Sequence, residues 1–142
     1  MSQATFLERL AQDRPLVADS AMGTQLHMRG VPIDAAFDEL NLKNPDLIVE
    51  VHRAYIRAGA EMIETNTFGA NRFKLAEHGL AEQVIAINRA GAQLARRAAE
   101  ESAHPVFVAG SVGPLGVSIQ PYGRIKAEDA RAAFAEQIGA LA

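Results

Sequence analysis

The sequence predicts an α/β fold with a parallel sheet, because strand-like and helical segments alternate along the chain. Three short, mostly apolar runs have the character of strands that are covered on both faces. Each run leads into a polar loop that contains glycine, and amphipathic helical patterns lie between the runs. Alternation of this kind is typical of parallel strands joined by right-handed crossovers. The runs are residues 16–19, 60–65 and 106–109.

The composition is that of an ordinary globular protein. The 142 residues are 49% hydrophobic and 22% charged, carry a net charge of −3 and include no cysteine. Lys and Arg do not cluster, so no nucleic-acid partner is expected. No apolar run approaches the roughly 20 residues of a membrane helix, and the N-terminus lacks a signal peptide, so we expect a cytoplasmic protein. Without cysteine, these residues form no disulfide and no thiolate metal site.

The N-terminal part of the chain predicts one helix, one strand and one long loop. Apolar residues at helical spacing predict an amphipathic helix over residues 4–12, which Pro15 ends before the first strand at 16–19. Residues 20–43 show little regularity, so we expect a loop with one helical turn. A loop of this length in a compact domain is usually functional. The apolar positions of the helix are Phe6, Leu7, Leu10 and Ala11.

A helix with clear boundaries precedes the second strand. Asn44 is expected to be its N-cap and Pro45 lies in its first turn, while Gly59 ends it. The second strand covers residues 60–65. The loop after this strand contains a short helical piece over residues 73–77.

The third strand lies between two longer helices. A helix is predicted over residues 81–101, and Pro105 precedes the strand at 106–109. Residues 110–124 form a loop rich in Gly and Pro, and residues 126–142 are again helical. The residues expected on the buried face of this last helix are Ala130, Phe134, Ile138 and Leu141.

Polar residues at the ends of the three strands are the candidate site residues, because ligand-binding groups in α/β folds lie at the carboxyl ends of strands. Asp19 either caps the turn that follows it or binds a ligand, for example an ammonium group, through a charge-assisted hydrogen bond. The short polar side chains of the second loop either form turns, which is the favoured interpretation, or contact a ligand. The candidate site residues at the three strand ends are Asp19, Thr65, Asn66, Thr67 and Ser111.

The loop Gly110–Pro114 has two interpretations. Its backbone amides could surround an anion, or it is a plain tight turn. It lacks the lysine of a P-loop and does not follow the pattern G-x-G-x-x-G. The motif by itself therefore does not identify a ligand.

The remaining charged residues and histidines are expected to be structural. Glu61 and Glu64 lie three positions apart on a strand and point to opposite faces, so they do not form a carboxylate pair. We expect Glu64 to face the pocket and Glu61 to face solvent. His52 is expected to pack or to lie at the surface. Arg72 and Lys74 are expected on a solvated loop face, with anion binding as the less favoured interpretation.

Taken together, the motifs 19–24, 64–68 and 110–114 resemble the beginning of a homocysteine S-methyltransferase domain. Their order and separation match that family, and the resemblance covers residues 16–142. The family includes the module of cobalamin-dependent methionine synthase and the methyltransferases that use betaine or S-methylmethionine. The bacterial members fused to a methylenetetrahydrofolate reductase domain are the most similar in character. Further similarities are Asn41-Leu42 before Asn44-Pro45, and the pair Asn71-Arg72.

The resemblance implies a (β/α)8 barrel, of which residues 1–142 would be the N-terminal part with about three β/α units. It also implies zinc-dependent methyl transfer to the thiolate of L-homocysteine, giving methionine. Asp19 and the backbone at Ser20 would hold the amino and carboxylate groups of homocysteine. The segments 65–68 and 110–114 would line the same pocket. The binding residues implied are Asp19, Ser20, Thr65, Asn66, Thr67, Phe68, Gly110 and Ser111, and none is assigned a catalytic or metal-binding role.

The sequence departs from the family pattern at two places. Ser20 stands where the family usually has glycine, a residue that permits a close backbone approach. The three cysteines that bind zinc in the family are absent, so we expect them after residue 142 and expect the segment alone to be inactive. FAD is implied only if a reductase domain follows.

Several alternatives remain open at this point. The methyl donor could be methyltetrahydrofolate, S-methylmethionine or a betaine-like compound. Instead of an enzyme segment, the chain could be a non-catalytic barrel fragment that self-associates through open sheet edges. It could also belong to a phosphate-binding barrel enzyme of another class.

Overall fold

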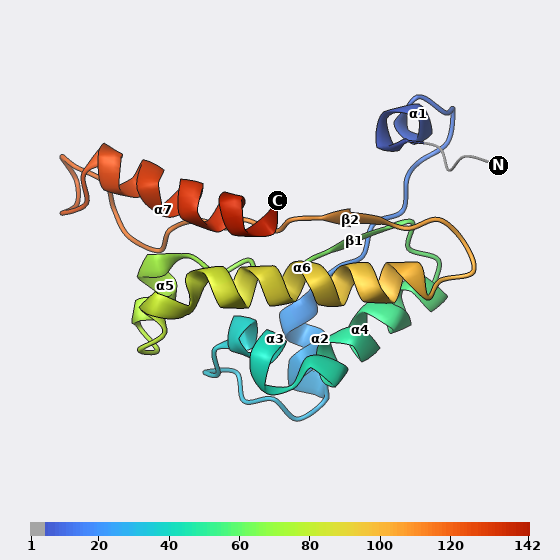
Figure 1. Cartoon of the computed structure of the whole chain (residues 1–142), viewed down its shortest axis with the longest axis horizontal. Coiled ribbons are helices and arrows are strands. Elements are labelled where there is room, and N and C mark those ends of the chain that lie inside the picture. The colour runs from blue at the N-terminus through green and yellow to red at the C-terminus, as the bar shows by residue number, and fades with distance from the viewer. Residues whose placement is uncertain (1–4) are drawn as a thin grey trace.

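Three parallel segments form the centre of the computed structural model, which describes residues 5–142 (Figure 1). Strand β1 (Met62–Glu64) pairs in parallel with β2 (Phe107–Ala109), with Met62 opposite Phe107. The segment 16–19 lies along the other side of β1, where Ala18 makes a parallel bridge with Met62. The predicted parallel arrangement is confirmed, but the first predicted strand is reduced to this single bridge.

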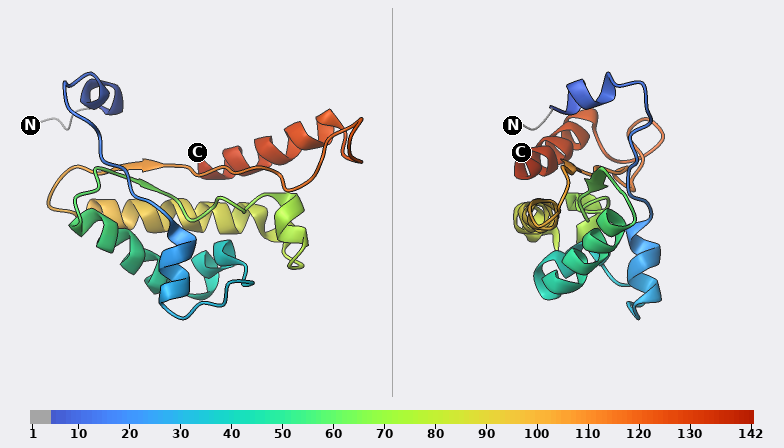
Figure 2. Two further views of the ribbon diagram at one scale, coloured as in Figure 1. Left: turned by 180° about the vertical axis from the view of Figure 1, so that it is seen from behind. Right: turned by 90° about the vertical axis from the view of Figure 1, so that its right-hand side faces the viewer.

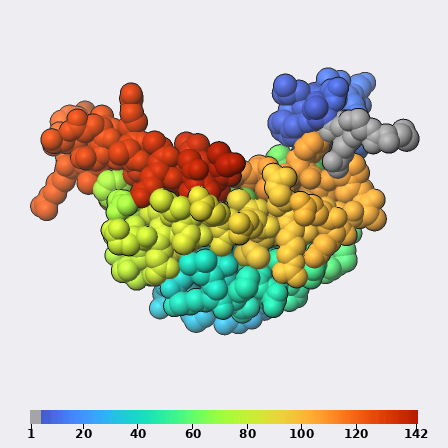
Figure 3. Space-filling view, viewed as in Figure 1, coloured from blue at the N-terminus to red at the C-terminus, as the bar shows by residue number. Residues whose placement is uncertain are grey.

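Helices cover one face of this small sheet. Helix α4 (Pro45–Arg57) and helix α6 (Val84–Glu100) lie on the same side of the strands, and Ile63 of β1 points into the apolar cluster between them. Figure 2 shows that the segment 16–19 passes beside β1 and that the chain then continues into the helices on this side of the strands. The alternate side chains, such as Met62 and Phe107, point to the opposite face and remain partly exposed. In the space-filling view the molecule is hollowed above the strands (Figure 3).

The segment 20–43 is more regular than its sequence predicts. It contains α2 (Met22–Met28), a 3-10 turn η1 (Phe37–Glu39) and α3 (Leu40–Lys43). The prediction of a long loop was wrong because α2 is stabilised by packing rather than by capping. Leu26 of α2 is fully buried in one apolar cluster with two residues of α4.

Helix α1 (Phe6–Leu10) is anchored by a buried charge and by an edge-on contact of Phe6 with Phe107, whose ring centres lie 5.4 Å apart. Its predicted apolar residues are exposed, while Arg9 is only 4% exposed and donates two hydrogen bonds of 2.8 Å to the carboxylate of Glu61. The expectation that Glu61 faces solvent was therefore wrong. Hydrogen bonding by Arg9, with a smaller contribution from Arg14, lowers the pKa of Glu61 to about 2.

The other helix boundaries agree broadly with the sequence. Asn44 makes no side-chain cap, so the start of α4 is marked by Pro45 alone, whereas Asn71 caps α5 (Arg72–Ala76). The long predicted helix begins as a 3-10 turn η2 (Ala81–Gln83) before α6.

Helix α7 (Ala127–Leu141) runs along α6 and buries a stripe of small residues (Figure 1). Ala130 is buried as predicted, but Ile138 is 53% exposed. Small side chains at the contact allow the two helices to approach closely, which rotates the larger Ile138 outward. The buried residues of α7 are Ala130, Ala133, Gln137 and Ala140. Within residues 5–142, none of the helices has the length and apolar character needed to cross a membrane.

Candidate functional site

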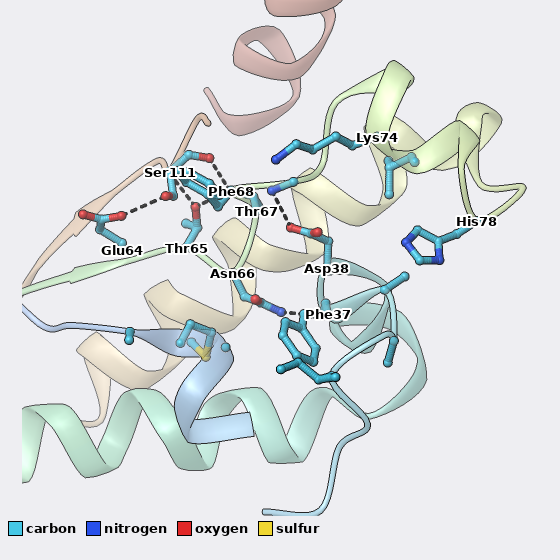
Figure 4. Close-up of a pocket in the computed structure, with 18 of the residues that line it drawn as sticks. Phe37, Asp38, Glu64, Thr65, Asn66, Thr67, Phe68, Lys74, His78 and Ser111 are labelled. Carbon is cyan, nitrogen blue, oxygen red and sulfur yellow. Dashed lines mark hydrogen bonds between the residues drawn. The ribbon is translucent and has the colours of Figure 1, made fainter. Parts of the chain in front are cut away.

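A cleft of about 650 Å³ opens at the carboxyl ends of the three parallel segments (Figure 4). Gly110 does not line the cleft, and a Cβ on it would lie 3.2 Å from Leu141 Cδ1, so this glycine lies against the end of α7 instead. The other predicted residues do line it, namely Asp19, Ser20, Thr65, Asn66, Thr67, Phe68 and Ser111.

Asp19 joins the first segment to β1. Its Oδ2 accepts a hydrogen bond of 3.0 Å from the backbone N–H of Glu64, so it does not cap the turn after its own strand. Burial raises the pKa of Asp19 to about 6. The N–H of Glu64 acts in the opposite direction, and the nearby Glu64 carboxylate adds repulsion that raises the pKa further.

Glu64 stands beside Asp19 at the same end of the cleft. Ser111 Oγ donates a hydrogen bond of 2.8 Å to Glu64 Oε2, which fixes this exposed carboxylate in the cleft wall. The expectation that Glu64 faces the pocket is confirmed, although the sequence did not indicate its partner. Asp19 and Glu64 together make this end of the cleft acidic.

Thr65, Thr67 and Ser111 form a closed hydrogen-bond circuit (Figure 4). Ser111 N–H donates to Thr65 Oγ1 over 2.9 Å, and Thr67 Oγ1 donates to the Ser111 carbonyl over 2.8 Å. The two threonine hydroxyls lie 2.6 Å apart. Because Thr67 already donates elsewhere, the Thr65 hydroxyl is the donor between them. These side chains therefore hold two loops together and shape the cleft wall.

Asn66 also has a structural task. Its Nδ2 donates to the Phe37 carbonyl over 2.8 Å and to Asn41 Oδ1 over 3.0 Å. Asn41 returns a hydrogen bond of 2.8 Å to the Asn66 carbonyl. This reciprocal pair ties the segment 37–41 to the loop after β1.

Two backbone amides of the loop 110–114 are already bound within the chain. Ser111 N–H is bound by Thr65, and Gly113 N–H donates to the Phe68 carbonyl over 3.1 Å. A Cβ on Gly113 would lie 2.5 Å from that same carbonyl, so glycine is required for this close approach. The geometry favours the tight-turn interpretation over an anion cradle.

The outer part of the cleft is built from aromatic and charged side chains. Phe68 is 57% exposed, and Lys74 Nζ lies 5.2 Å from the centre of its ring, a cation–π arrangement. Lys74 is thus partly buried rather than fully solvated. The side chain of Arg72 is 42% exposed, in agreement with the expected solvated face, and it forms an ion pair of 2.6 Å with Glu136 of α7.

Asp38 lies in this outer part and was missed by the sequence analysis. Its Oδ1 accepts a hydrogen bond of 3.1 Å from Gly69 N–H, and a Cβ on Gly69 would come 2.7 Å from Oδ2. Burial raises the pKa of Asp38, while Gly69 N–H and the charges of Lys74 and His78 oppose that change. No spacing signal indicated Asp38, because the segment around it read as an irregular loop.

The described residues contain no metal centre. Across residues 5–142, no three His, Cys, Asp or Glu side chains are grouped so that they could hold a metal ion. His52 lies apart from the cleft, is fully buried on α4, and has no hydrogen-bond partner on either ring nitrogen.

An α/β domain with an acidic cleft at its strand ends is the class that this fold and site define. The sequence profile of the homocysteine S-methyltransferase family matches residues 16–142. The chain therefore belongs to that family. The expected resemblance is confirmed over most of the chain.

Known relatives agree with this assignment. The methionine synthases of Mycobacterium leprae and Mycobacterium tuberculosis are 37% and 35% identical over 140 residues, which is 92% of this chain. The crystal structure of the homocysteine methyltransferase MmuM from Escherichia coli in its metallated form superposes with a TM-score of 0.77 at 32% identity over 95% of this chain. The chain spans 11% and 12% of the two synthases and 52% of the MmuM chain.

Proposed function

We propose that this chain is the homocysteine-binding, N-terminal part of an enzyme that transfers a methyl group to L-homocysteine and releases methionine. Residues 1–142 would contribute about three β/α units of a (β/α)8 barrel, the remaining units being supplied by other sequence. Family membership and the coverage of about half of the MmuM chain support this proposal.

The pair of carboxylates at the acidic end of the cleft is the observation that carries the proposal. Within the described chain, Asp19 Oδ1 and Glu64 Oε1 accept no hydrogen bond from another residue. Two such oxygens at strand ends can accept charge-assisted hydrogen bonds from the ammonium group of an amino acid. The Ser20 backbone lies beside them and is the candidate contact for the substrate carboxylate.

In the methyl transfer, the role of Asp19, Ser20 and Glu64 would be to bind and orient homocysteine. A lone pair on the homocysteine sulfur attacks the methyl carbon, the new S–C bond forms as the methyl–donor bond breaks, and the donor keeps that electron pair. The thiol releases its proton to solvent before this attack, because the thiolate is the nucleophile. Fixing the amino-acid end of homocysteine against Asp19 and Glu64 limits the directions in which the sulfur can point.

These residues do not fit a zinc site. The sequence contains no cysteine, and the described residues group no other metal ligands. A zinc ion in the complete enzyme would take its protein ligands from outside this sequence. The segment alone would then bind homocysteine weakly and be inactive, and FAD would belong to a fused reductase domain. The methyl donor remains open among a folate, a sulfonium and a betaine-like compound.

The test is an Asp19→Asn substitution in the full-length protein, assayed by homocysteine binding and methionine formation. We expect the dissociation constant to rise about tenfold or more, since a charge-assisted hydrogen bond contributes about 1.5–3 kcal/mol. In the parent protein the affinity should fall as the pH drops below about 6, where Asp19 becomes protonated, and this dependence should weaken in the variant. The matched control is Asp13→Asn on the exposed N-terminal segment. Unchanged homocysteine affinity in Asp19→Asn would remove Asp19 from the site.

The non-catalytic alternative rests on the sheet edges. Within residues 5–142, β2 pairs only with β1, and an unpaired strand edge can pair with another chain. An isolated 142-residue segment would then self-associate. Light scattering showing a stable monomer would count against this alternative.

A further inference from the structure

Gln137 is an unusual residue for the face of α7 that packs on α6. It is fully buried among alanines, and its amide reaches past them to the loop after β1. Its Nε2 donates to the Thr67 carbonyl over 2.7 Å and to Asn88 Oδ1 over 3.3 Å. Its Oε1 is buried and has no hydrogen-bond partner. An unsatisfied buried acceptor is costly, so a glutamine here calls for an explanation beyond helix packing.

The hydrogen-bond partners of Gln137 explain why a glutamine is buried at this position. Asn88 of α6, which accepts a hydrogen bond from Gln137, donates from its own Nδ2 to the Ala70 carbonyl over 2.8 Å. Asn41 of α3 holds the Asn66 carbonyl in the same way. Three amides from three helices thus hold three carbonyls of the loop 65–71, those of residues 66, 67 and 70. All three side chains are at most 3% exposed.

The Thr67 carbonyl is the central point of this support. It accepts from Gln137 and also from Ala70 N–H at 3.0 Å, which closes the turn at the top of the loop. Thr67 itself carries the hydroxyl that binds the loop after β2 through the Ser111 carbonyl. A shift of Thr67 would therefore be transmitted to Ser111, which holds Glu64 in the cleft wall.

We propose that Gln137 is a positioning residue for the substrate cleft. It connects α7, the helix that follows β2, to the loop that shapes the carboxylate end of the cleft. Its role in homocysteine binding rests on the function proposed above, whereas its role in holding the loop does not.

The primary test is Gln137→Met in the full-length protein, because methionine has a similar volume and no donor. We expect deuterium exchange in the peptide 65–71, including the Ala70 amide, to be about fivefold to tenfold faster, the effect of losing one or two buried hydrogen bonds. Homocysteine KM should rise by a similar factor while kcat changes less than about twofold, since the loop positions the substrate rather than the reacting atoms. The control is Ala133→Gly, which weakens α7 where it packs on Leu115 and does not touch the loop. It should lower the melting temperature without changing either readout.

The outcomes separate the two proposals. If exchange in 65–71 is unchanged in Gln137→Met, the positioning role is refuted whatever the substrate is. If exchange accelerates but the parent protein binds no homocysteine, the support of the loop stands and the proposed function fails. If exchange accelerates and KM is unchanged, Gln137 stabilises the loop without positioning the substrate, and this inference is overturned. Should Gln137→Met fail to fold, Gln137→Asn keeps the amide but shortens its reach, and the same readouts apply.

Discussion

Acid should destabilise this protein through His52. The side chain is fully buried on α4, and neither ring nitrogen has a hydrogen-bond partner. Burial lowers its pKa from the ordinary 6.5 to about 4. The folded protein therefore keeps His52 neutral at a pH where the unfolded chain already binds a proton.

The magnitude follows from that difference in pKa. Between about pH 6.5 and pH 4 the unfolded state binds more protons at His52 than the folded state, so the free energy of unfolding falls as the pH falls. At 1.36 kcal/mol per pKa unit, the loss attributable to His52 is about 3 kcal/mol. Above about pH 6.5 both states are neutral at this position and the contribution is constant.

Urea unfolding of the parent protein and of His52→Leu, measured across this pH range, tests the reasoning. Leucine removes the titratable group and the two unsatisfied nitrogens, so its stability at neutral pH should be similar to or greater than that of the parent. On acidification the variant should lose about 3 kcal/mol less than the parent. His27→Gln, at an exposed position, is the control and should follow the parent. Parallel pH curves for the parent and His52→Leu would refute the assigned burial of a neutral histidine.

Three further substitutions test the packing beneath the cleft, an open position on α7 and the anchor of α1. A Cβ on Gly91 would lie 2.6 Å from Thr67 Cγ2, so Gly91→Ala should destabilise the protein by about 1–3 kcal/mol in thermal unfolding. Gly139→Ala on α7, where a Cβ meets nothing within 4 Å, should instead stabilise it by about 0.5–1 kcal/mol. Arg9→Met should raise the pKa of Glu61 from about 2 toward its ordinary value in an NMR titration, because the hydrogen bonds from Arg9 are the main cause of the lowered pKa. If the pKa of Glu61 were the same in Arg9→Met as in the unsubstituted protein, α1 would not be held by this ion pair in solution.

Periodicity and strand ends were enough to predict the order of helices and strands from residue 45 onward. Their signals are local, since α4 and α6 carry apolar residues at helical spacing along their own length. The segment 20–43 could not be predicted in this way, because its helices are short and α2 is stabilised by Leu26 packing on distant parts of the chain. The prediction of the buried face of α1 was wrong for the same reason. Its buried contact is made by Arg9 with the carboxylate of Glu61, which lies 52 residues away in the sequence.

The candidate site was predicted in part, and the structure changes the meaning of what was predicted. Seven of the eight residues line one cleft, which follows from the rule that strand ends converge. Asp38 and Gln137 were out of reach of that rule, because neither lies at a strand end. Their roles depend on carbonyls and amides that only the folded chain brings near them.

The side chains of the motif 65–67 are therefore not the expected substrate contacts. The hydroxyls of Thr65 and Thr67 and the amide nitrogen of Asn66 are committed to other parts of the chain. A group whose hydrogen bonds are already made gains little from a ligand that must displace them. Asp19 and Glu64 differ, since each carboxylate has one oxygen without a bond from another residue among those described. The motif 65–67 shapes the cleft, and under the proposed function the carboxylates of Asp19 and Glu64 are the groups expected to recognise the substrate.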